Sequence, residues 1–227
     1  MKIQALIWDF DGLVIDTEGV IFQSWQELYQ NYGCHLPLEQ WIETIGTAEA
    51  SFDPAVELER QLDRKLDWDR IEPGRAGREK ELIDQLPPLP GVEDMLHKAS
   101  AHGLKIGLAS CSSCAWITEN LTRLGLLHYF DCLITSENVS HSKPDPQVFQ
   151  AALSALDVSP EQAVVFEDSP NGILAAKRAG IFAIAIPCPL TYDLNLDQAD
   201  LRLASLADIS FEALLESIEQ QHENMIE

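Results

Sequence analysis

The chain has 227 residues, of which 46% are hydrophobic and 23% are charged, a composition typical of one large globular domain or of a core domain with a smaller insert. Its formal net charge of −22 argues against nucleic acid and anionic membranes as partners, because like charges repel over a Debye length. An anionic ligand would need a local cation or a helix N-terminus to offset this charge.

The cysteines and the N-terminus bear on the compartment. The cysteines are odd in number and sparse, which is typical of reduced thiols: Cys34, Cys111, Cys114, Cys132 and Cys188. The first residues lack the length and cleavage site of a signal peptide, and no apolar run is long enough to span a membrane. We expect a cytoplasmic protein; the oligomeric state is open, with a monomer favoured.

Short apolar runs predict the strands. Residues 4–8 are almost continuously apolar and stop at Asp9-Phe-Asp-Gly12, which indicates a buried parallel strand followed by a turn. Similar runs at 104–109, 132–135, 163–166 and 181–186 alternate with helical patterns. This alternation predicts an α/β fold with a doubly wound, Rossmann-like parallel sheet and a ligand crevice at the carboxyl ends of its strands.

Between residues 17 and 86 the strand signals disappear, and Leu38, Trp41, Ile42 and Ile45 show helical spacing. We expect an all-helical cap domain at 17–87, inserted after the first strand, and a catalytic core made of 1–16 and 88–227. The proline-rich segment 86–91 is a candidate hinge, because proline disfavours helix in the residue before it.

Two helices of the core have clear boundaries. Apolar residues recur with helical spacing at 92–99, directly after Pro90-Gly91. In the next unit, Ser169 can cap a helix, Pro170 suits its first position, and Gly180 fits just past its end.

Polar side chains follow the predicted strands at their carboxyl ends, where they would face one crevice. Asp9 and Asp11 follow the first strand, Ser110 the second, Lys143 comes after the third, and the fourth ends in Glu167 and Asp168. Two carboxylates about 5 Å apart would repel by roughly 3 kcal/mol at an effective dielectric of about 20. A proton or a cation is therefore expected beside Asp9 and Asp11.

These residue types suit phosphoryl transfer. Hard oxygen ligands without a histidine pair or thiolates favour Mg²⁺. One carboxylate can act as nucleophile while its neighbour transfers protons. Ser110 precedes a predicted helix N-terminus that can hold phosphate oxygens, and Lys143 can neutralise both phosphate and nucleophile.

Four segments together resemble, in order and spacing, the four motifs of the haloacid-dehalogenase-like superfamily: Asp9-Phe-Asp-Gly-Leu-Val-Ile-Asp-Thr17, Ser110, Lys143-Pro-Asp-Pro146 and Glu167-Asp-Ser-Pro-Asn-Gly172. The resemblance spans residues 4 to about 187. The helical insert resembles the cap of the subfamily that contains β-phosphoglucomutase and many sugar phosphatases.

The resemblance implies a role for each residue. Asp9 would form an aspartyl phosphate, and Asp11 would act as general acid and base. Ser110 and Lys143 would bind phosphate. Mg²⁺ would be held by Asp9, by the carbonyl of Asp11 and by Asp168, with Glu167 as a further ligand or just behind. The implied function is a magnesium-dependent phosphatase for a small phosphate ester, expected from the resemblance to be a sugar phosphate.

Three other functions compete with this one. A sugar-phosphate mutase would return the phosphate to another hydroxyl, but the segment 44–51, which resembles the family's specificity loop, lacks the arginine expected to grip a distal phosphate. A haloacid dehalogenase is disfavoured by Asp11, the second acid that those enzymes lack. A non-catalytic phosphometabolite-binding protein would keep the pocket without turnover.

Two further patterns have competing explanations. Cys111 and Cys114 form a CxxC motif that could be redox-active, although Ser110 already accounts for this loop. The basic residues of the insert could grip substrate, but surface ion pairs with the neighbouring acids are the default expectation: Arg60, Arg64, Lys65, Arg70, Arg75, Arg78 and Lys80.

Overall fold

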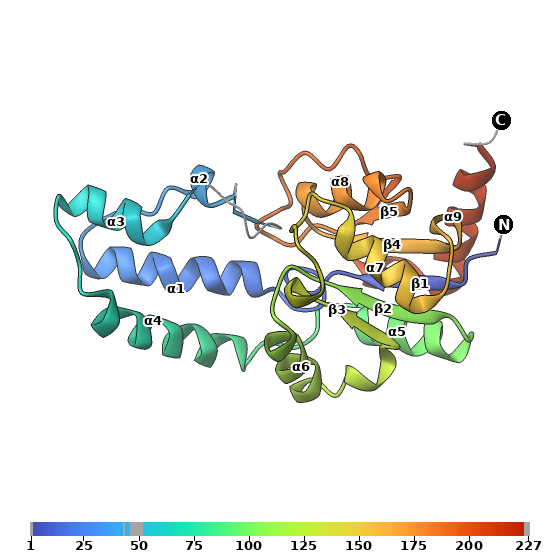
Figure 1. Ribbon diagram of the computed structural model, residues 1–227, viewed down its shortest axis with the longest axis horizontal. Coiled ribbons are helices and arrows are strands. Elements are labelled where there is room, and N and C mark those ends of the chain that lie inside the picture. Colours follow the sequence, from blue (N-terminus) through green and yellow to red (C-terminus); the bar gives the residue numbers. More distant parts are fainter. Residues whose placement is uncertain (1, 43, 46–51, 225–227) are drawn as a thin grey trace.

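The computed structural model describes residues 2–42, 44–45 and 52–224. Its centre is a parallel six-stranded sheet of order β3-β2-β1-β4-β5-β6 (Figure 1). The strands are β1 (Ala5–Trp8), β2 (Lys105–Ala109), β3 (Cys132–Ile134), β4 (Ala163–Glu167), β5 (Phe182–Ala185) and β6 (Leu201–Arg202). The five predicted strands are confirmed to within two residues at each end, and the doubly wound fold with them. The sixth, β6, was missed because a two-residue strand carries no periodic signal.

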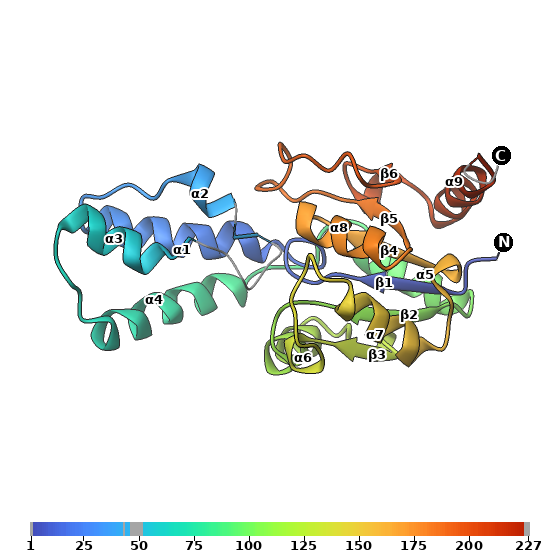
Figure 2. The same ribbon diagram turned by 45° about the horizontal axis from the view of Figure 1, so that its top comes forward.

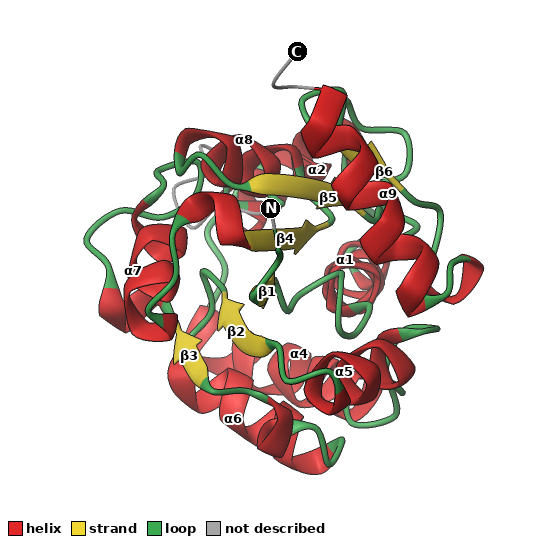
Figure 3. Ribbon diagram, turned by 90° about the vertical axis from the view of Figure 1, so that its right-hand side faces the viewer, coloured by secondary structure: helices red, strands yellow, loops and turns green. Residues whose placement is uncertain are grey.

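Helices cover both faces of the sheet (Figure 3). One face packs against α5 (Val92–Ala101), α6 (Cys114–Arg123) and α9 (Phe211–Asn224), and the other against α7 (Gln147–Leu156) and α8 (Pro170–Arg178). Within β1, Leu6 and Trp8 belong to the first layer, whereas Ala5 and Ile7 belong to the second. Burial on both faces explains why the strands read as continuous apolar runs.

The predicted helix boundaries in the core are confirmed. Helix α5 begins directly after Gly91. Ser169 caps α8 by accepting a hydrogen bond from the Gly172 N–H, Pro170 is the first residue of α8, and Gly180 follows with φ of 78°.

Within its described residues, the insert contains no strand and four helices: α1 (Thr17–Asn31), α2 (Leu38–Ile42), α3 (Pro54–Leu62) and α4 (Trp68–Ile83). Helices α1 and α4 lie side by side and extend away from the sheet (Figure 2). A small core centred on Tyr29, Trp41 and Leu58 packs within the insert. The all-helical character of the insert is therefore confirmed, whereas its boundaries as a domain at 17 and 87 stay a prediction.

The two segments that join the insert to the sheet lie together. The Leu89 N–H donates a hydrogen bond of 2.8 Å to the carbonyl of Val14. Leu13, Val14 and Leu89 also pack into the larger core of the sheet. The insert is thus anchored to the carboxyl edge of the sheet through two adjacent chain segments.

Candidate active site

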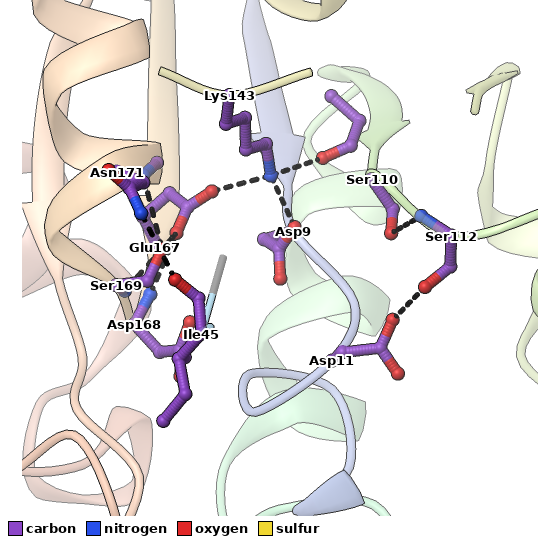
Figure 4. A network of polar contacts seen from close by, with 12 residues as sticks. Asp9, Asp11, Ile45, Ser110, Ser112, Lys143, Glu167, Asp168, Ser169 and Asn171 are labelled. Atoms are coloured by element: carbon purple, nitrogen blue, oxygen red, sulfur yellow. Dashed lines mark hydrogen bonds and ion pairs between the residues drawn. The ribbon is translucent and has the colours of Figure 1, made fainter. Parts of the chain in front are cut away.

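The buried ammonium of Lys143 joins three strand ends (Figure 4). It donates to Asp9 Oδ1, to Glu167 Oε1 at 2.6 Å and to the carbonyl oxygen of Ala109 at 2.9 Å. Asp9 lies directly after β1, and its N–H continues the sheet by donating to the Phe166 carbonyl at 3.0 Å. Three of the predicted site residues therefore meet at one point.

Glu167 is fully buried beneath the first turn of α8. Its Oε2 accepts from the Asp168 N–H at 3.1 Å, the Ser169 N–H at 3.3 Å and the Ser169 hydroxyl at 3.1 Å. A Cβ atom added to Gly172 would lie 1.9 Å from Glu167 Cδ. Glycine at this position therefore lets α8 close over the Glu167 carboxylate.

Asp168 is also buried and faces the turn that follows Asp9. The Thr191 hydroxyl donates to Asp168 Oδ2 at 3.4 Å. Gly12 has φ of 82°, and a Cβ atom there would lie 2.2 Å from the same oxygen. Gly12 thus satisfies both the left-handed backbone and the close approach of the two strand ends.

Asp9, Glu167 and Asp168 form a buried cluster in which one carboxylate oxygen from each residue lies within 4.8 Å of the others. Burial raises the pKa of Asp9 to about 8; Lys143 opposes the shift, and Glu167 and Asp11 add to it. Burial, Glu167 and Asp9 likewise raise the pKa of Asp168. Burial alone would lower the pKa of Lys143, but Asp9 and Glu167 raise it above its ordinary value.

This charge balance suits a divalent cation. Three buried carboxylates share a single ammonium, so the cluster has an excess of negative charge that a cation would neutralise. Carboxylate oxygens are also the ligands that Mg²⁺ prefers. The residues present therefore fit the predicted metal.

The Asp11 carboxylate points away from this cluster, toward the loop after β2 (Figure 4). Its Oδ1 accepts from the Thr17 hydroxyl at 2.8 Å and from Trp116 Nε1 at 3.1 Å, and its Oδ2 accepts from the Ser112 hydroxyl at 2.5 Å. Strand β1 ends at Trp8, so the two-residue alternation of a strand, which would point Asp9 and Asp11 the same way, does not extend to these residues. The expected mutual repulsion is a minor cause of the raised pKa of Asp9, behind burial and Glu167.

Ser110 lies directly after β2 and is buried. Its N–H donates to the carbonyl of Ile134 at 3.0 Å, and its hydroxyl oxygen accepts from the Ser112 N–H at 3.0 Å. Both residues line the same cavity as Asp9 and Lys143. Ser110 is thus brought to the predicted site.

This cavity has a volume of about 420 Å³ and lies between the sheet edge and the insert. The core contributes Asp9, Asp11, Ser110, Cys111, Ser112, Ser113, Trp116 and Lys143; the insert contributes Glu18, Ile21, Thr44 and Glu79. Glu167 and Asp168 are not among these lining residues. The site predicted from sequence is therefore assembled, with its acidic cluster partly behind the cavity wall.

Several lining residues were not predicted. Ser112 and Trp116 hold Asp11, but their distance from Ser110 in the sequence does not single them out. Glu18 lies in the first turn of α1, where burial raises its pKa to about 8 and Asp11 and Asp9 add to the shift. A glutamate at a helix start is common, so Glu18 could not be singled out from the sequence.

The remaining sequence hypotheses can also be located. Burial raises the pKa of Cys111, with Lys143 opposing, which is the reverse of the lowered pKa of redox-active thiols. Cys111 and Cys114 do not form a disulfide. Among the described residues, none of the insert's Lys and Arg side chains lines the cavity, and five of them form ion pairs with acids. The expectation of surface ion pairs is confirmed for Arg60, Lys65, Arg78 and Lys80. Arg75 also pairs with acids, but its side chain is only 9% exposed.

The predicted specificity loop at 44–51 is only partly described. Thr44 lines the cavity, and the carbonyl of Ile45 accepts a hydrogen bond from Asn171 Nδ2 at 3.2 Å. Residues 46–51 lie outside the described residues.

Comparisons with known proteins identify the family. Residues 6–186 match the model of the haloacid dehalogenase-like hydrolases. YhcW of Bacillus subtilis, named as a phosphatase with no substrate in its name, is 39% identical and aligns over 97% of this chain and 100% of its own. The phosphorylated carbohydrates phosphatase of Thermotoga maritima is 31% identical over 96% of this chain and 99% of its own.

A solved structure with a similar fold supports this assignment. The β-phosphoglucomutase of Clostridium difficile has a TM-score of 0.77 at 25% identity, covering 99% of this chain and 100% of that protein. None of the helices in the described part of this chain combines the length and apolar character that a membrane crossing requires. With four motifs gathered at one sheet edge and a family match across most of its length, the chain belongs to the haloacid dehalogenase-like hydrolases.

Proposed function

We propose that this enzyme is a magnesium-dependent phosphatase that hydrolyses a small sugar phosphate through a phosphorylated Asp9. The observation that carries the proposal is the buried Asp9 carboxylate at the wall of the cavity between the sheet edge and the insert. Asp9 Oδ1 contacts the Lys143 ammonium, and the other oxygen points away from it (Figure 4). A nucleophile and a phosphate-neutralising cation are thus adjacent.

The reaction has two halves. In the first, a carboxylate oxygen of Asp9 bonds to phosphorus, the ester P–O bond breaks, and protonated Asp11 gives its proton to the departing alcohol oxygen. In the second, Asp11 takes a proton from water as the water oxygen bonds to phosphorus. The bond between Asp9 and phosphorus then breaks, which releases inorganic phosphate and restores both carboxyl groups.

Each remaining residue supports one of these steps. Ser110 and Lys143 would hold the phosphate oxygens, and Lys143 would offset their charge. Three donors, the hydroxyls of Thr17 and Ser112 and the indole N–H of Trp116, hold the Asp11 carboxylate toward the loop after β2. The helical insert, as a cap over residues 17–87, would exclude bulk water from the cavity.

Mg²⁺ would be held by the carboxylates of Asp9 and Asp168 and by the backbone carbonyl of Asp11. When bound, it would neutralise charge on the phosphate. Glu167 fits a supporting position better, because both of its oxygens already accept hydrogen bonds from Lys143, Ser169 and the Asp168 N–H. In that position Glu167 would fix Lys143 and the N-terminus of α8.

The similarity to β-phosphoglucomutase raises the alternative of a mutase. A mutase must bind a bisphosphate intermediate at both ends. Residue 43 and residues 46–51 contain no Lys or Arg, and no described cation other than Lys143 lines the cavity. Transfer to water is therefore favoured over return to a second hydroxyl.

The test is phosphate release from a panel of sugar, nucleotide and small-acid phosphates with Mg²⁺. We expect turnover of sugar phosphates that EDTA abolishes and that Asp9→Asn lowers by at least about 10³-fold. Glu81→Gln, on an exposed part of α4, serves as the control and should retain wild-type activity. Isomerised sugar phosphate without free phosphate would instead identify a mutase, and ligand binding without any turnover would identify a binding protein.

We also propose a cytoplasmic location and a monomeric state for this enzyme. None of the five cysteines, all of which are described, forms a disulfide, which fits a reducing cytoplasm. We retain a small phosphorylated metabolite as the partner and a monomer as the favoured state.

A further inference from the structure

The end of the cavity that faces the insert is acidic. Glu18 from α1 and Glu79 from α4 line it together with Ile21 and Thr44. Asp9, Ser110 and Lys143 line the cavity from the sheet. A substrate that places its phosphate at Lys143 therefore presents its remaining groups to two glutamates.

No described cation is available at this end. Lys143 is engaged by Asp9 and Glu167. Arg75 is the nearest base to Glu79, and it lies behind that residue rather than in the cavity wall. Its guanidinium donates to Glu79 Oε2 at 2.5 Å, pairs with Glu72 and lies 4.5 Å from the centre of the Trp25 ring.

The undescribed residues on either side of Thr44 and Ile45 in the sequence add no positive charge. Residue 43 is glutamate, and residues 46–51 are Gly-Thr-Ala-Glu-Ala-Ser. Neither stretch can contribute a positive side chain. No described insert residue that lines the cavity is a Lys or Arg, and the sequence places none at residue 43 or at residues 46–51.

The lack of a positive side chain here determines which ligands can bind. A second phosphate carries a charge near −2 and needs cations or several donors to replace its water. Glu18 offers a hydroxyl when protonated and two acceptor oxygens when ionised, but in neither form a positive charge. Glu79, held by Arg75, offers carboxylate oxygens. Such oxygens accept hydrogen bonds from hydroxyl and ammonium groups.

We infer that the substrate is a monophosphate whose remote end carries hydroxyl or ammonium donors, that Glu18 and Glu79 accept hydrogen bonds from them, and that bisphosphates are rejected. This inference rests on the proposed phosphatase function and narrows its substrate class. Glu18 and Glu79 are then the specificity-determining residues of the insert.

The experiment measures how four compounds compete with p-nitrophenyl phosphate hydrolysis: fructose 6-phosphate, fructose 1,6-bisphosphate, glucose 6-phosphate and glucosamine 6-phosphate. In the wild type, we expect fructose 6-phosphate to bind at least about tenfold more tightly than the bisphosphate, a difference of about 1.4 kcal/mol. Glucosamine 6-phosphate should bind at least as tightly as glucose 6-phosphate. The glucose pair separates ammonium from hydroxyl recognition.

These competition assays are run at pH 9, above the Glu18 pKa of about 8, so that the side chain is ionised. There, Glu18→Gln should narrow both the preference for fructose 6-phosphate over the bisphosphate and any preference for glucosamine 6-phosphate over glucose 6-phosphate several-fold, because it keeps the shape of the side chain and removes its negative charge. Glu81→Gln, on the same α4 as Glu79 but with a 70% exposed side chain, should leave both unchanged. Equal or tighter binding of the bisphosphate in the wild type, or preferences that Glu18→Gln does not alter, would overturn the inference. Absence of hydrolysis of every ester would instead overturn the proposed phosphatase function.

Discussion

Lys143 holds the centre of the candidate site because its ammonium compensates two buried carboxylates at once. Its side chain is 2% exposed, and those of Asp9 and Glu167 are 9% and 0% exposed. Removing one partner of such a group leaves buried charge without compensation, which costs far more than the pair contributes. The stability of the fold and the chemistry of the site therefore depend on the same side chain.

Lys143→Met keeps the length of the side chain and removes its charge. We expect it to abolish phosphatase activity and to lower the free energy of unfolding by about 3–5 kcal/mol, measured by urea denaturation without metal. Lys98→Met, which breaks an exposed pair with Asp94, should cost less than about 1 kcal/mol. Equal losses in the two variants would contradict the compensating role of Lys143.

Glu18 makes stability depend on pH. Its pKa is raised from an ordinary value of 4.5 to about 8 by burial and by Asp11 and Asp9. Between these values the folded state holds a proton that the unfolded state has released, so stability contributed by this group falls as pH rises from about 4.5 to 8.

Glu18→Gln removes that dependence. Without metal, its melting temperature should exceed that of the wild type at pH 8 and match it near pH 4, as read from thermal scans across this range. Glu81→Gln should run parallel to the wild type at every pH. A difference at pH 4 as large as that at pH 8 would show that Glu18 affects stability through packing instead.

The residues that could be predicted from sequence are those at strand ends. Asp9 and Ser110 each follow an apolar run directly, and Asp168 follows one after Glu167, so the parallel topology alone brings them to one edge. Lys143 needed the family resemblance as well, since it comes nine residues after β3. Trp116, Glu18 and Glu79 could not be predicted, because their positions at the cavity depend on how α6, α1 and α4 pack.

Helix α8 couples its N-terminus to the acidic cluster through Gly172. The first turn of α8 lies so close to Glu167 that any side chain at 172 would overlap the carboxylate. An alanine at position 172 would therefore displace either α8 or Glu167. Displacing Glu167 would also disturb its contact with Lys143.

Gly172→Ala should lower stability by about 1–3 kcal/mol through overpacking and reduce kcat/KM substantially. Gly77→Ala is the matched control, because Gly77 lies inside α4 with open space where the Cβ would be. It should raise helix stability by up to about 1 kcal/mol. Full activity and stability in Gly172→Ala would contradict the tight contact between α8 and Glu167.

The strands and helices of the core could be predicted because each has a local sequence signal. A buried parallel strand is an apolar run, and Ser169, Pro170 and Gly180 mark the ends of α8. The insert was harder to resolve. Its described helices include α2, which has only five residues, so the spacing of Leu38, Trp41 and Ile42 indicated helix without revealing its length.

The molecule as a whole joins a sheet that supplies the chemistry to a helical insert that faces it across one cavity. Because the buried acidic cluster carries excess negative charge, a bound divalent cation should stabilise the entire fold. At a Mg²⁺ concentration about 100 times the dissociation constant, the gain would be about 2.7 kcal/mol.

Thermal scans at pH 8 should therefore show a higher melting temperature with Mg²⁺ than with EDTA, and Asp168→Asn should remove most of the difference. Asp131→Asn serves as the control, since Asp131 lies at the start of β3, away from the cluster. The same rise in Asp168→Asn as in the wild type would place the cation elsewhere.

The measurement that tests the central claim most directly is acid-quenched trapping of the phosphoenzyme during turnover, followed by peptide mapping. In Asp11→Asn, the second half of the reaction lacks its general base, so the account predicts that one phosphoryl group accumulates on Asp9. Asp9→Asn should carry none. Turnover by the wild type with no phosphorylated carboxylate in either form, or with phosphate on another residue, would contradict the account.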